Sequence, residues 1–220
     1  MRGTTVRKDL SGLTRLEQID ELRARMAAVT GEPAKGAATP VESPAEYALE
    51  VGLPAPLPRR GITECSECPA LAVELIRQVT AAGGYVGVIG WADLSFAAVE
   101  HLDQVITIPD PGSDPLGIAS ILVEGLDLVI LHSAVEMNLS PVRVRPLAGR
   151  LRRGQAALVL VGWKAPSPAL TIDAHVSAYR GIGRGTGRIT GYDIDVTVAD
   201  KTHRQHATYG VGQRPRLRAV

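Results

Sequence analysis

The chain has 220 residues, of which 45% are hydrophobic and only 4% aromatic, and its formal net charge is +1. This length fits one globular domain with a short appendage, and the composition predicts a core of Val, Leu, Ile and Ala, as in a parallel sheet flanked by helices. The sequence contains no run of about 18 apolar residues and no apolar signal core, which excludes a membrane-spanning helix. Two cysteines cannot build the disulfide framework of a small secreted domain. We therefore expect a cytoplasmic protein without a membrane partner.

Charge is distributed unevenly along the chain. Residues 143–220 contain 14 Lys or Arg against 4 Asp or Glu, whereas residues 1–142 contain 10 against 19. A basic C-terminal third favours nucleic acid or an acidic protein as a partner. The alternative interpretation is ordinary solvated surface.

The first predicted element is an amphipathic helix at residues 14–29. Its apolar side chains share one narrow face, and Ser11 or Thr14 is a suitable N-cap. Residues 30–46 follow with three prolines and few side chains to bury, which is typical of a flexible linker. The helix therefore needs a surface to cover its apolar face, either on its own domain or on a partner. The residues of this candidate partner-binding face are Leu16, Ile19, Leu22 and Met26.

Residues 47–200 form the predicted core domain, in which short apolar runs alternate with helical patterns. The predicted buried strands are residues 61–65, 85–90, 104–108, 127–131 and 156–162. The predicted helices are residues 69–82, 94–102, 115–125 and 141–153, the last of them interrupted by Pro146. This alternation predicts an α/β domain with a mostly parallel sheet flanked by helices.

The C-terminal region has a different pattern. Residues 170–180 and 187–200 alternate between polar and apolar side chains around the glycine-rich stretch GIGRGTG. This alternation predicts an antiparallel hairpin with one exposed face. Residues 201–220 are predicted to form a basic, poorly packed tail.

A C-x-x-C motif, Cys65 and Cys68, lies where a predicted strand ends and a predicted helix begins. Thioredoxin-like redox sites have this geometry, because a helix N-terminus stabilises a thiolate. However, Glu64 and Glu67 oppose thiolate formation, and Pro109 leads into a loop where a thioredoxin-like fold requires a strand. No second Cys pair or His-x-x-x-His motif completes a zinc site. We therefore expect unreactive thiols and no metal.

The same junction is where nucleotide-binding α/β domains carry the phosphate loop G-x-x-x-x-G-K-[ST]. Glycines in that loop let backbone N–H groups surround the phosphates, and its lysine neutralises them. Residues 61–72 have no glycine after Gly61, no lysine and two glutamates. The second nucleotide element is also missing, because the strand at 127–131 is followed by His132 and not by a magnesium-binding carboxylate. We predict no cofactor and no enzyme activity; the alternative is an ATPase with an unorthodox site.

The order of several segments resembles that of the RecA-like ImuA proteins, and most of all their actinobacterial ImuA′ branch, over about residues 10–200. The segments are RRGITEC (59–65), AAGGYVGVIGWADL (81–94), EGLDLVILHS (124–133), AALVLVGW (156–163) and YRGIGRGTGRITGYDIDVTV (179–198). The resemblance implies a RecA-like fold and a role in SOS-induced translesion mutagenesis. It implies two partners: ImuB, a Y-family-like protein without polymerase activity, and an error-prone C-family polymerase. Because the phosphate loop is missing, ATPase activity of relatives is not carried over.

The surfaces expected to contact these partners follow from the same resemblance and from charge. The helix at 14–29 resembles the N-terminal element by which RecA-like domains pack onto a neighbouring subunit. Few aromatic residues lie near the glycine-rich turn, namely Tyr179 and Tyr192, so base stacking is expected to be weak. Any DNA binding would therefore be non-specific and salt-dependent. The candidate contacts to DNA or an acidic partner are Arg180, Arg184, Arg188, Arg214, Arg216 and Arg218.

The predicted function is therefore a non-catalytic scaffold of a translesion mutasome that binds an ImuB-like protein. DNA is a second candidate partner, and the sequence does not decide whether it binds directly. The C-family polymerase is reached directly or through ImuB. The alternative is a SulA-like inhibitor of cell division, since SulA-like proteins also resemble RecA without the phosphate loop and cap a tubulin-like polymer. SulA-like proteins are shorter and do not require a basic C-terminal third.

Overall fold

The computed structural model describes residues 48–183 and 185–212 of the chain. The predicted helix at 14–29, with Leu16, Ile19, Leu22 and Met26, lies outside the described residues, as do the linker and Arg184, Arg214, Arg216 and Arg218. Within the described ranges, none of the helices has both the length and the apolar composition needed to cross a bilayer.

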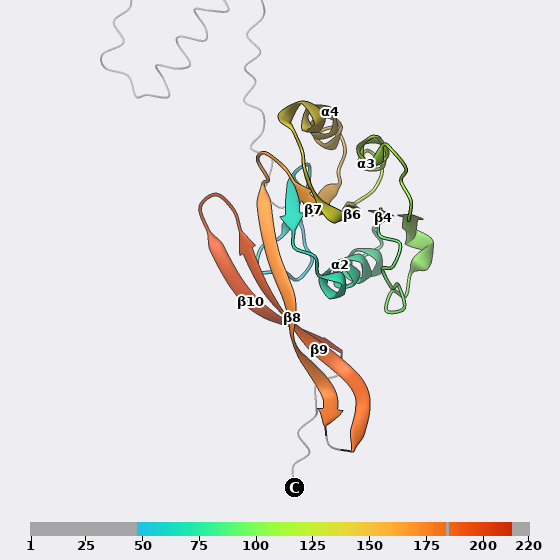
Figure 1. Cartoon of the computed structure of the whole chain (residues 1–220), viewed down its shortest axis with the longest axis vertical. Coiled ribbons are helices and arrows are strands. Elements are labelled where there is room, and N and C mark those ends of the chain that lie inside the picture. Colours follow the sequence, from blue (N-terminus) through green and yellow to red (C-terminus); the bar gives the residue numbers. More distant parts are fainter. Residues whose placement is uncertain (1–47, 184, 213–220) are drawn as a thin grey trace, which may run out of the picture. The chain divides into compact units, whose positions relative to one another are not determined.

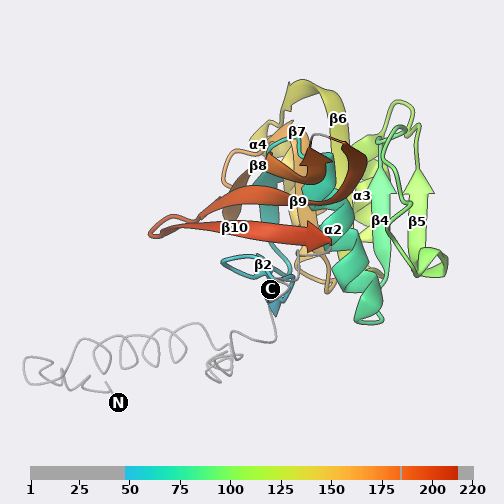
Figure 2. The ribbon, with the colours of Figure 1, turned by 90° about the horizontal axis from the view of Figure 1, so that it is seen from below.

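An eight-stranded sheet forms the centre of the domain, in the order β10-β9-β8-β3-β7-β6-β4-β5 (Figures 1 and 2). Its strands are β3 (Ile62–Cys65), β4 (Val86–Ile89), β5 (Val105–Ile108), β6 (Leu128–Asn138), β7 (Ala157–Lys164), β8 (Leu170–Gly183), β9 (Thr186–Ala199) and β10 (Arg204–Gly212). All neighbours from β5 to β8 are parallel, whereas β9 is antiparallel to both β8 and β10. β1 (Ala48–Leu49) and β2 (Leu57–Pro58) form a separate antiparallel pair. The predicted RecA-like α/β fold with a C-terminal antiparallel hairpin is confirmed.

Among the residues that the structure describes, three α-helices cover the sheet, and all three begin in the same way. They are α2 (Pro69–Ala81), α3 (Pro115–Leu122) and α4 (Pro141–Leu151), each with proline in its first turn. Proline is suited to this position because its fixed φ is helical and its missing N–H would have no partner there. Asp114 and Ser140 cap α3 and α4 by accepting hydrogen bonds from the backbone N–H groups of Gly117 and Arg143.

Each face of the sheet has its own hydrophobic core. Leu128 and Ile130 of β6 face α2, whereas Val129 and Leu131 of the same strand face α3 and α4. All four side chains are fully buried. Strands buried on both faces read as continuous apolar runs in the sequence, which is why the parallel strands were predictable.

The predicted helix at residues 94–102 is wrong. These residues form turns that lead into a short 3₁₀ helix, η2 (Leu102–Gln104). Leu94 and Val99, together with Trp91, are buried in the core on the α2 side. The segment therefore packs on the sheet as a loop. Its apolar residues are apolar because they are buried, and they do not indicate a helix.

The predicted interruption of the helix at Pro146 is also wrong, because α4 runs through this residue. An interior proline removes one backbone hydrogen bond and disfavours a helix. Here Pro146 lies on the exposed side of α4, while Val144, Leu147 and Leu151 are buried against the sheet. The packing of this buried face of α4 against the sheet stabilises the helix despite the proline.

The expectation of a poorly packed tail after residue 200 is wrong for residues 204–212. These residues form β10, which pairs with β9 from Arg204 opposite Ala199 to Gly212 opposite Gly191. Ala207, Tyr209 and Val211 are half-buried and point to the same face. Their alternation is the strand signal that the basic composition of this region obscured.

The distal parts of β8 and β9 extend beyond the helices, as Figure 1 shows. We call residues 177–183 and 185–190 the arm. The pairing of β8 with β9 is irregular between Val176 and Ala178 and again between Arg180 and Ile182. At the second irregularity Gly181 has a φ of +86°, and a Cβ atom there would lie 2.3 Å from the carbonyl oxygen of Arg188. Glycine is therefore required where the arm bends.

Candidate functional site

Three residues, Ser66 to Cys68, connect β3 to α2 at the carboxyl edge of the parallel strands. Ligands of open α/β sheets bind at this edge. Here the junction is tied to β8: the Ser66 backbone N–H donates to Ile172 O at 2.9 Å. The Ser66 hydroxyl also donates to Ala174 O at 3.1 Å and accepts from Ala174 N at 2.8 Å. The polar groups of Ser66 that could face a phosphate therefore already have protein partners.

Glu64 near the end of β3 is held by the last residue of β7 and by the residue that follows it. Its carboxylate accepts a hydrogen bond from the backbone N–H of Ala165 at 2.6 Å and forms an ion pair with Lys164 at 3.7 Å. Its side chain is largely buried. This carboxylate connects two strands and keeps negative charge at the strand end where a phosphate would bind.

The two thiols of the junction are free cysteines. Burial raises the pKa of Cys65 to about 12, with further contributions from Cys68 and Asp173. Burial also raises the pKa of Cys68, against the hydrogen bonds from the backbone of Leu71 and Ala70. A thiolate is the nucleophilic form of cysteine. Both side chains are therefore protonated thiols at neutral pH.

His132 occupies the end of the buried part of β6. Its Nδ1 lies 2.9 Å from Gly90 O, and since a carbonyl can only accept, Nδ1 carries the proton. The imidazole stacks on the Trp91 indole, with ring centroids 4.3 Å apart and planes 10° apart. Its Nε2 has no hydrogen-bond partner among the described residues, and the nearest carboxylate oxygen, on Glu67, is 3.9 Å away. The ring fills this position as a packed group.

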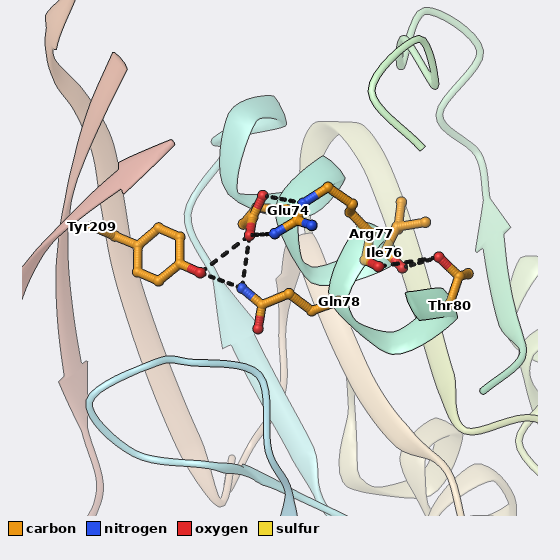
Figure 3. Close-up of polar contacts among 6 residues, drawn as sticks. All are labelled: Glu74, Ile76, Arg77, Gln78, Thr80 and Tyr209. Carbon is orange, nitrogen blue, oxygen red and sulfur yellow. Dashed lines mark hydrogen bonds and ion pairs between the residues drawn. The ribbon is translucent and has the colours of Figure 1, made fainter. Parts of the chain in front are cut away.

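A polar cluster that the sequence analysis missed connects α2 to β10 (Figure 3). The buried Glu74 carboxylate accepts from Arg77 Nη2 at 2.6 Å, from Gln78 Nε2 at 2.7 Å and from the Tyr209 hydroxyl at 3.1 Å. Burial alone would raise the pKa of Glu74, but the hydrogen bonds and charge of Arg77 and the other donors hold it below its usual value. Burial and the Glu74 charge raise the pKa of Tyr209. A glutamate between the buried Leu71 and Leu75 was the signal in the sequence for such a cluster.

The predicted contact arginines of the arm lie in different environments. Arg180 forms an ion pair with Asp193 and donates to Tyr192 O at 3.3 Å and Val211 O at 2.6 Å, so its guanidinium joins β8, β9 and β10. Arg188 is exposed, and no described residue pairs with it. In the arm, Arg188 is therefore exposed, whereas Arg180 is bound within the sheet.

The arm also exposes three large hydrophobic side chains. Tyr179, Ile182 and Ile189 are 58%, 60% and 53% exposed. Near its base, an apolar groove of about 270 Å³ lies between the start of α2, residues 94–98 and Tyr192. Apolar side chains beside a cation are the composition of a protein interface. The sequence analysis had named only arginines as candidate contacts in this region and had considered Tyr179 only for base stacking.

The strand order, the helices on both faces and the short β3–α2 junction define a RecA-like α/β domain. In this domain the polar groups of Ser66 and Glu64 at the junction are bonded to β8 and to the end of β7. The chain belongs to the family described as the MT3502 N-terminal domain, which matches residues 51–166.

Two further similarities concern individual proteins. The uncharacterized protein Rv3395c of Mycobacterium tuberculosis is 32% identical over 193 residues, which cover 82% of this chain and 90% of that protein. Among solved structures, the flagellar accessory protein FlaH from Methanocaldococcus jannaschii is similar with a TM-score of 0.40 and 10% identity, over 67% of this chain and 81% of FlaH.

Proposed function

We propose that this chain is a non-catalytic RecA-like scaffold of the ImuA′ type, which acts in the cytoplasm in DNA-damage-induced translesion synthesis. Its direct partner is an ImuB-like Y-family protein, through which it joins an error-prone C-family polymerase. The proposal rests on the ordered resemblance of its segments to ImuA′ proteins and on the closed β3–α2 junction.

The closed junction is the observation that carries the non-catalytic part of the proposal. A phosphate loop needs backbone N–H groups that curl around the anion and a lysine that neutralises it. At this junction Ser66 is bonded to β8, Glu64 places a carboxylate at the strand end, and Pro69 removes one N–H from the first turn of α2. The phosphates of a nucleoside triphosphate would meet the negative charge of Glu64 at a position where they need hydrogen-bond donors.

The partner-binding part of the proposal is assigned to the arm. Protein interfaces are centred on a few large, mainly apolar side chains that become fully buried, with charged residues around them. Tyr179, Ile182 and Ile189 supply exposed apolar groups, and Arg188 supplies the charge. The groove beside Tyr192 can receive an apolar side chain of the partner.

Nucleotide binding is tested by thermal unfolding of the full chain with and without MgATP, with an ATP-binding RecA protein as the positive control. We expect an unchanged unfolding midpoint. A ligand at about one hundred times its dissociation constant stabilises the folded state by about 2.7 kcal/mol. A concentration-dependent rise of the midpoint would therefore overturn the non-catalytic part.

Partner binding is tested by co-purification with an ImuB-like protein and by titration calorimetry. We expect micromolar or tighter association, and a loss of about tenfold or more for the Ile182→Asp, Ile189→Asp double variant, since a buried charge is costly at an interface. The control is Ile121→Asp, which places one such charge on an exposed isoleucine of α3, outside the arm. No association of the unmodified chain at micromolar concentration would exclude the proposed partner.

A further inference from the structure

A basic groove of about 250 Å³ lies at the amino end of β3, opposite to the β3–α2 junction. Gly61 and Ile62 line it at the start of β3, and Leu151 lines it at the end of α4. Three cations from separate parts of the chain surround it, and none of the residues that line it is acidic; the cations are Arg60, Arg152 and Lys201. This composition is suited to an anion.

Arg60 is fixed at this groove by its backbone and its side chain. It has a φ of +61°, which is unfavourable for a residue with a side chain. Its backbone N–H donates to Ala156 O at 2.8 Å, and its Nε donates to Gly154 O at 3.1 Å. The guanidinium charge is therefore held at the groove in one orientation.

The basic surface continues from the groove along the exposed side of α4. Arg145 and Arg152 are two helical turns apart and lie on the same side of the helix. Arg143 is also exposed, and it precedes Ala148, the first residue of α4 that lines the groove. From Arg143 to Arg152 the helix rises by about 14 Å. The positive charges are thus spread along the helix and are not gathered at one point.

Most of these cations have no ionic partner within the described part of the chain. Glu124 lies beside this surface, where its carboxylate is 3.7 Å from Arg150 and 3.9 Å from Arg153. Arg143, Arg145, Arg152 and Lys201 form no ion pair with another described residue. Asp200, beside Lys201, instead accepts hydrogen bonds from Thr202 and His203 within its own turn.

We propose that this groove and the exposed side of α4 bind the phosphate backbone of nucleic acid. A row of cations lies beside the groove, and four of them form no ion pair with a described residue: Arg143, Arg145, Arg152 and Lys201. Such a row matches a chain of phosphates, which Arg and Lys neutralise with release of counterions. Gly61, Ala148 and Ala169 line the groove with small groups, and its large apolar residues, Ile62 and Leu151, are themselves buried in the domain. The groove therefore lacks the exposed large apolar side chain that a protein interface needs at its centre. The composition favours nucleic acid over an acidic protein.

The lack of aromatic residues along the groove determines the kind of binding. Single-strand binding proteins gain affinity by stacking bases on aromatic side chains, and no aromatic residue lines this groove. Binding is therefore independent of sequence, steeply dependent on salt, and tighter for duplex than for single-stranded DNA, because the duplex has the higher charge density. This inference stands independently of the mutasome proposal, since it needs neither an ImuB-like partner nor the arm.

The test measures fluorescence anisotropy of labelled duplex and oligothymidylate DNA with the full chain. We expect the triple variant Arg145→Gln, Arg152→Gln, Lys201→Gln to lose about tenfold or more in affinity at low salt. The plot of log affinity against log salt becomes less steep by roughly 0.9 per cation removed for duplex DNA. The double variant Arg145→Lys, Arg152→Lys keeps the charges and retains binding.

The control is Lys164→Gln, which removes one positive charge at the carboxyl end of β7, as Arg152→Gln removes one from the groove at the opposite edge of the sheet. We expect Arg152→Gln to weaken DNA binding and Lys164→Gln to leave it unchanged. Equal losses in the two variants, or full affinity in the triple variant, would overturn the proposal. It would also be overturned if polyglutamate or phosphatidylglycerol vesicles bound and DNA did not. If the triple variant does not fold, the comparison of Arg152→Gln with Lys164→Gln decides the question.

Discussion

The Tyr209 hydroxyl in β10 donates a hydrogen bond of 3.1 Å to the buried carboxylate of Glu74 in α2, 135 residues earlier in the chain. Gln78 and Arg77 donate to the same carboxylate. A buried charge is tolerated only when it is paired and hydrogen-bonded. By supplying the Tyr209 hydroxyl, β10 therefore helps to stabilise a buried glutamate on the inner face of α2.

Replacing Tyr209 by Phe removes one donor from this carboxylate and retains the ring. We expect the free energy of unfolding to fall by about 1–3 kcal/mol, because hydrogen bonds to charged groups contribute this much. Urea denaturation measures the change. Tyr179→Phe is the control, since that tyrosine is exposed, and the two variants should differ clearly in midpoint. Equal midpoints would show that the Tyr209 hydroxyl contributes nothing to stability.

The low pKa of Glu74 predicts a specific dependence of stability on pH. A carboxyl group whose pKa is lowered by folding stabilises the protein above its unfolded pKa of about 4.3, and this contribution is lost as pH falls through the folded pKa. We expect Glu74→Gln to make the decline of stability below about pH 4.3 less steep. Unfolding free energies measured across the acid range test this. Glu136→Gln, at an exposed position, should leave the slope unchanged.

The raised pKa of Cys65, about 12, predicts a slow reaction with thiol reagents. Since an unfolded cysteine has a pKa of about 8.5, the thiolate fraction at neutral pH falls by roughly three orders of magnitude. We expect folded protein to react much more slowly with a chromogenic disulfide than urea-unfolded protein. The Cys65→Ser, Cys68→Ala variant should keep partner and DNA binding. Rapid reaction of the folded chain, or formation of a Cys65–Cys68 disulfide in air, would argue for a redox role.

Gly90, before Trp91, is required by the backbone as well as by packing. Its φ is +75°, and a Cβ atom there would lie 2.5 Å from His132 O. We expect Gly90→Ala to destabilise the fold by at least about 2 kcal/mol, from the left-handed backbone and the clash together. Thermal unfolding measures the effect. At Gly125 a Cβ atom would meet nothing within 4 Å, so Gly125→Ala should be nearly neutral; a similar loss in both would contradict the assignment.

Much of the fold was predictable from the sequence, because the signals are local. Parallel strands buried on both faces are continuous apolar runs, and the alternation at 170–200 reports one exposed face of the hairpin. The absence of a phosphate loop could also be read directly from residues 61–72. What could not be read were two features decided by packing at a distance: the helix through Pro146 and the loop at 94–102. Strand β10 had a local signal in its alternating side chains, but the basic composition of the region obscured it.

The candidate sites were less predictable than the fold. Arg180 and Arg188 are equivalent in the sequence, yet the structure joins Arg180 to Asp193 and leaves Arg188 exposed. The difference arises from the bend at Gly181 and from β10, neither of which has a local signal for side-chain pairing. The basic groove combines Arg60, Arg152 and Lys201, which are far apart in the chain, so only the folded arrangement brings them together.

The position of β3 at the centre of the sheet has a consequence for synthesis on the ribosome. β3 pairs with β7 at residues 158–161 and with β8 at residues 170–172, so both of its edges stay open until about a hundred more residues have been translated. At roughly 5–20 residues per second this takes about 5–20 s. During that interval the nascent chain has a strand without either neighbour, and strands with open edges are prone to aggregate. Chaperone binding to the emerging polypeptide is expected to be strongest between translation of β3 and completion of β8.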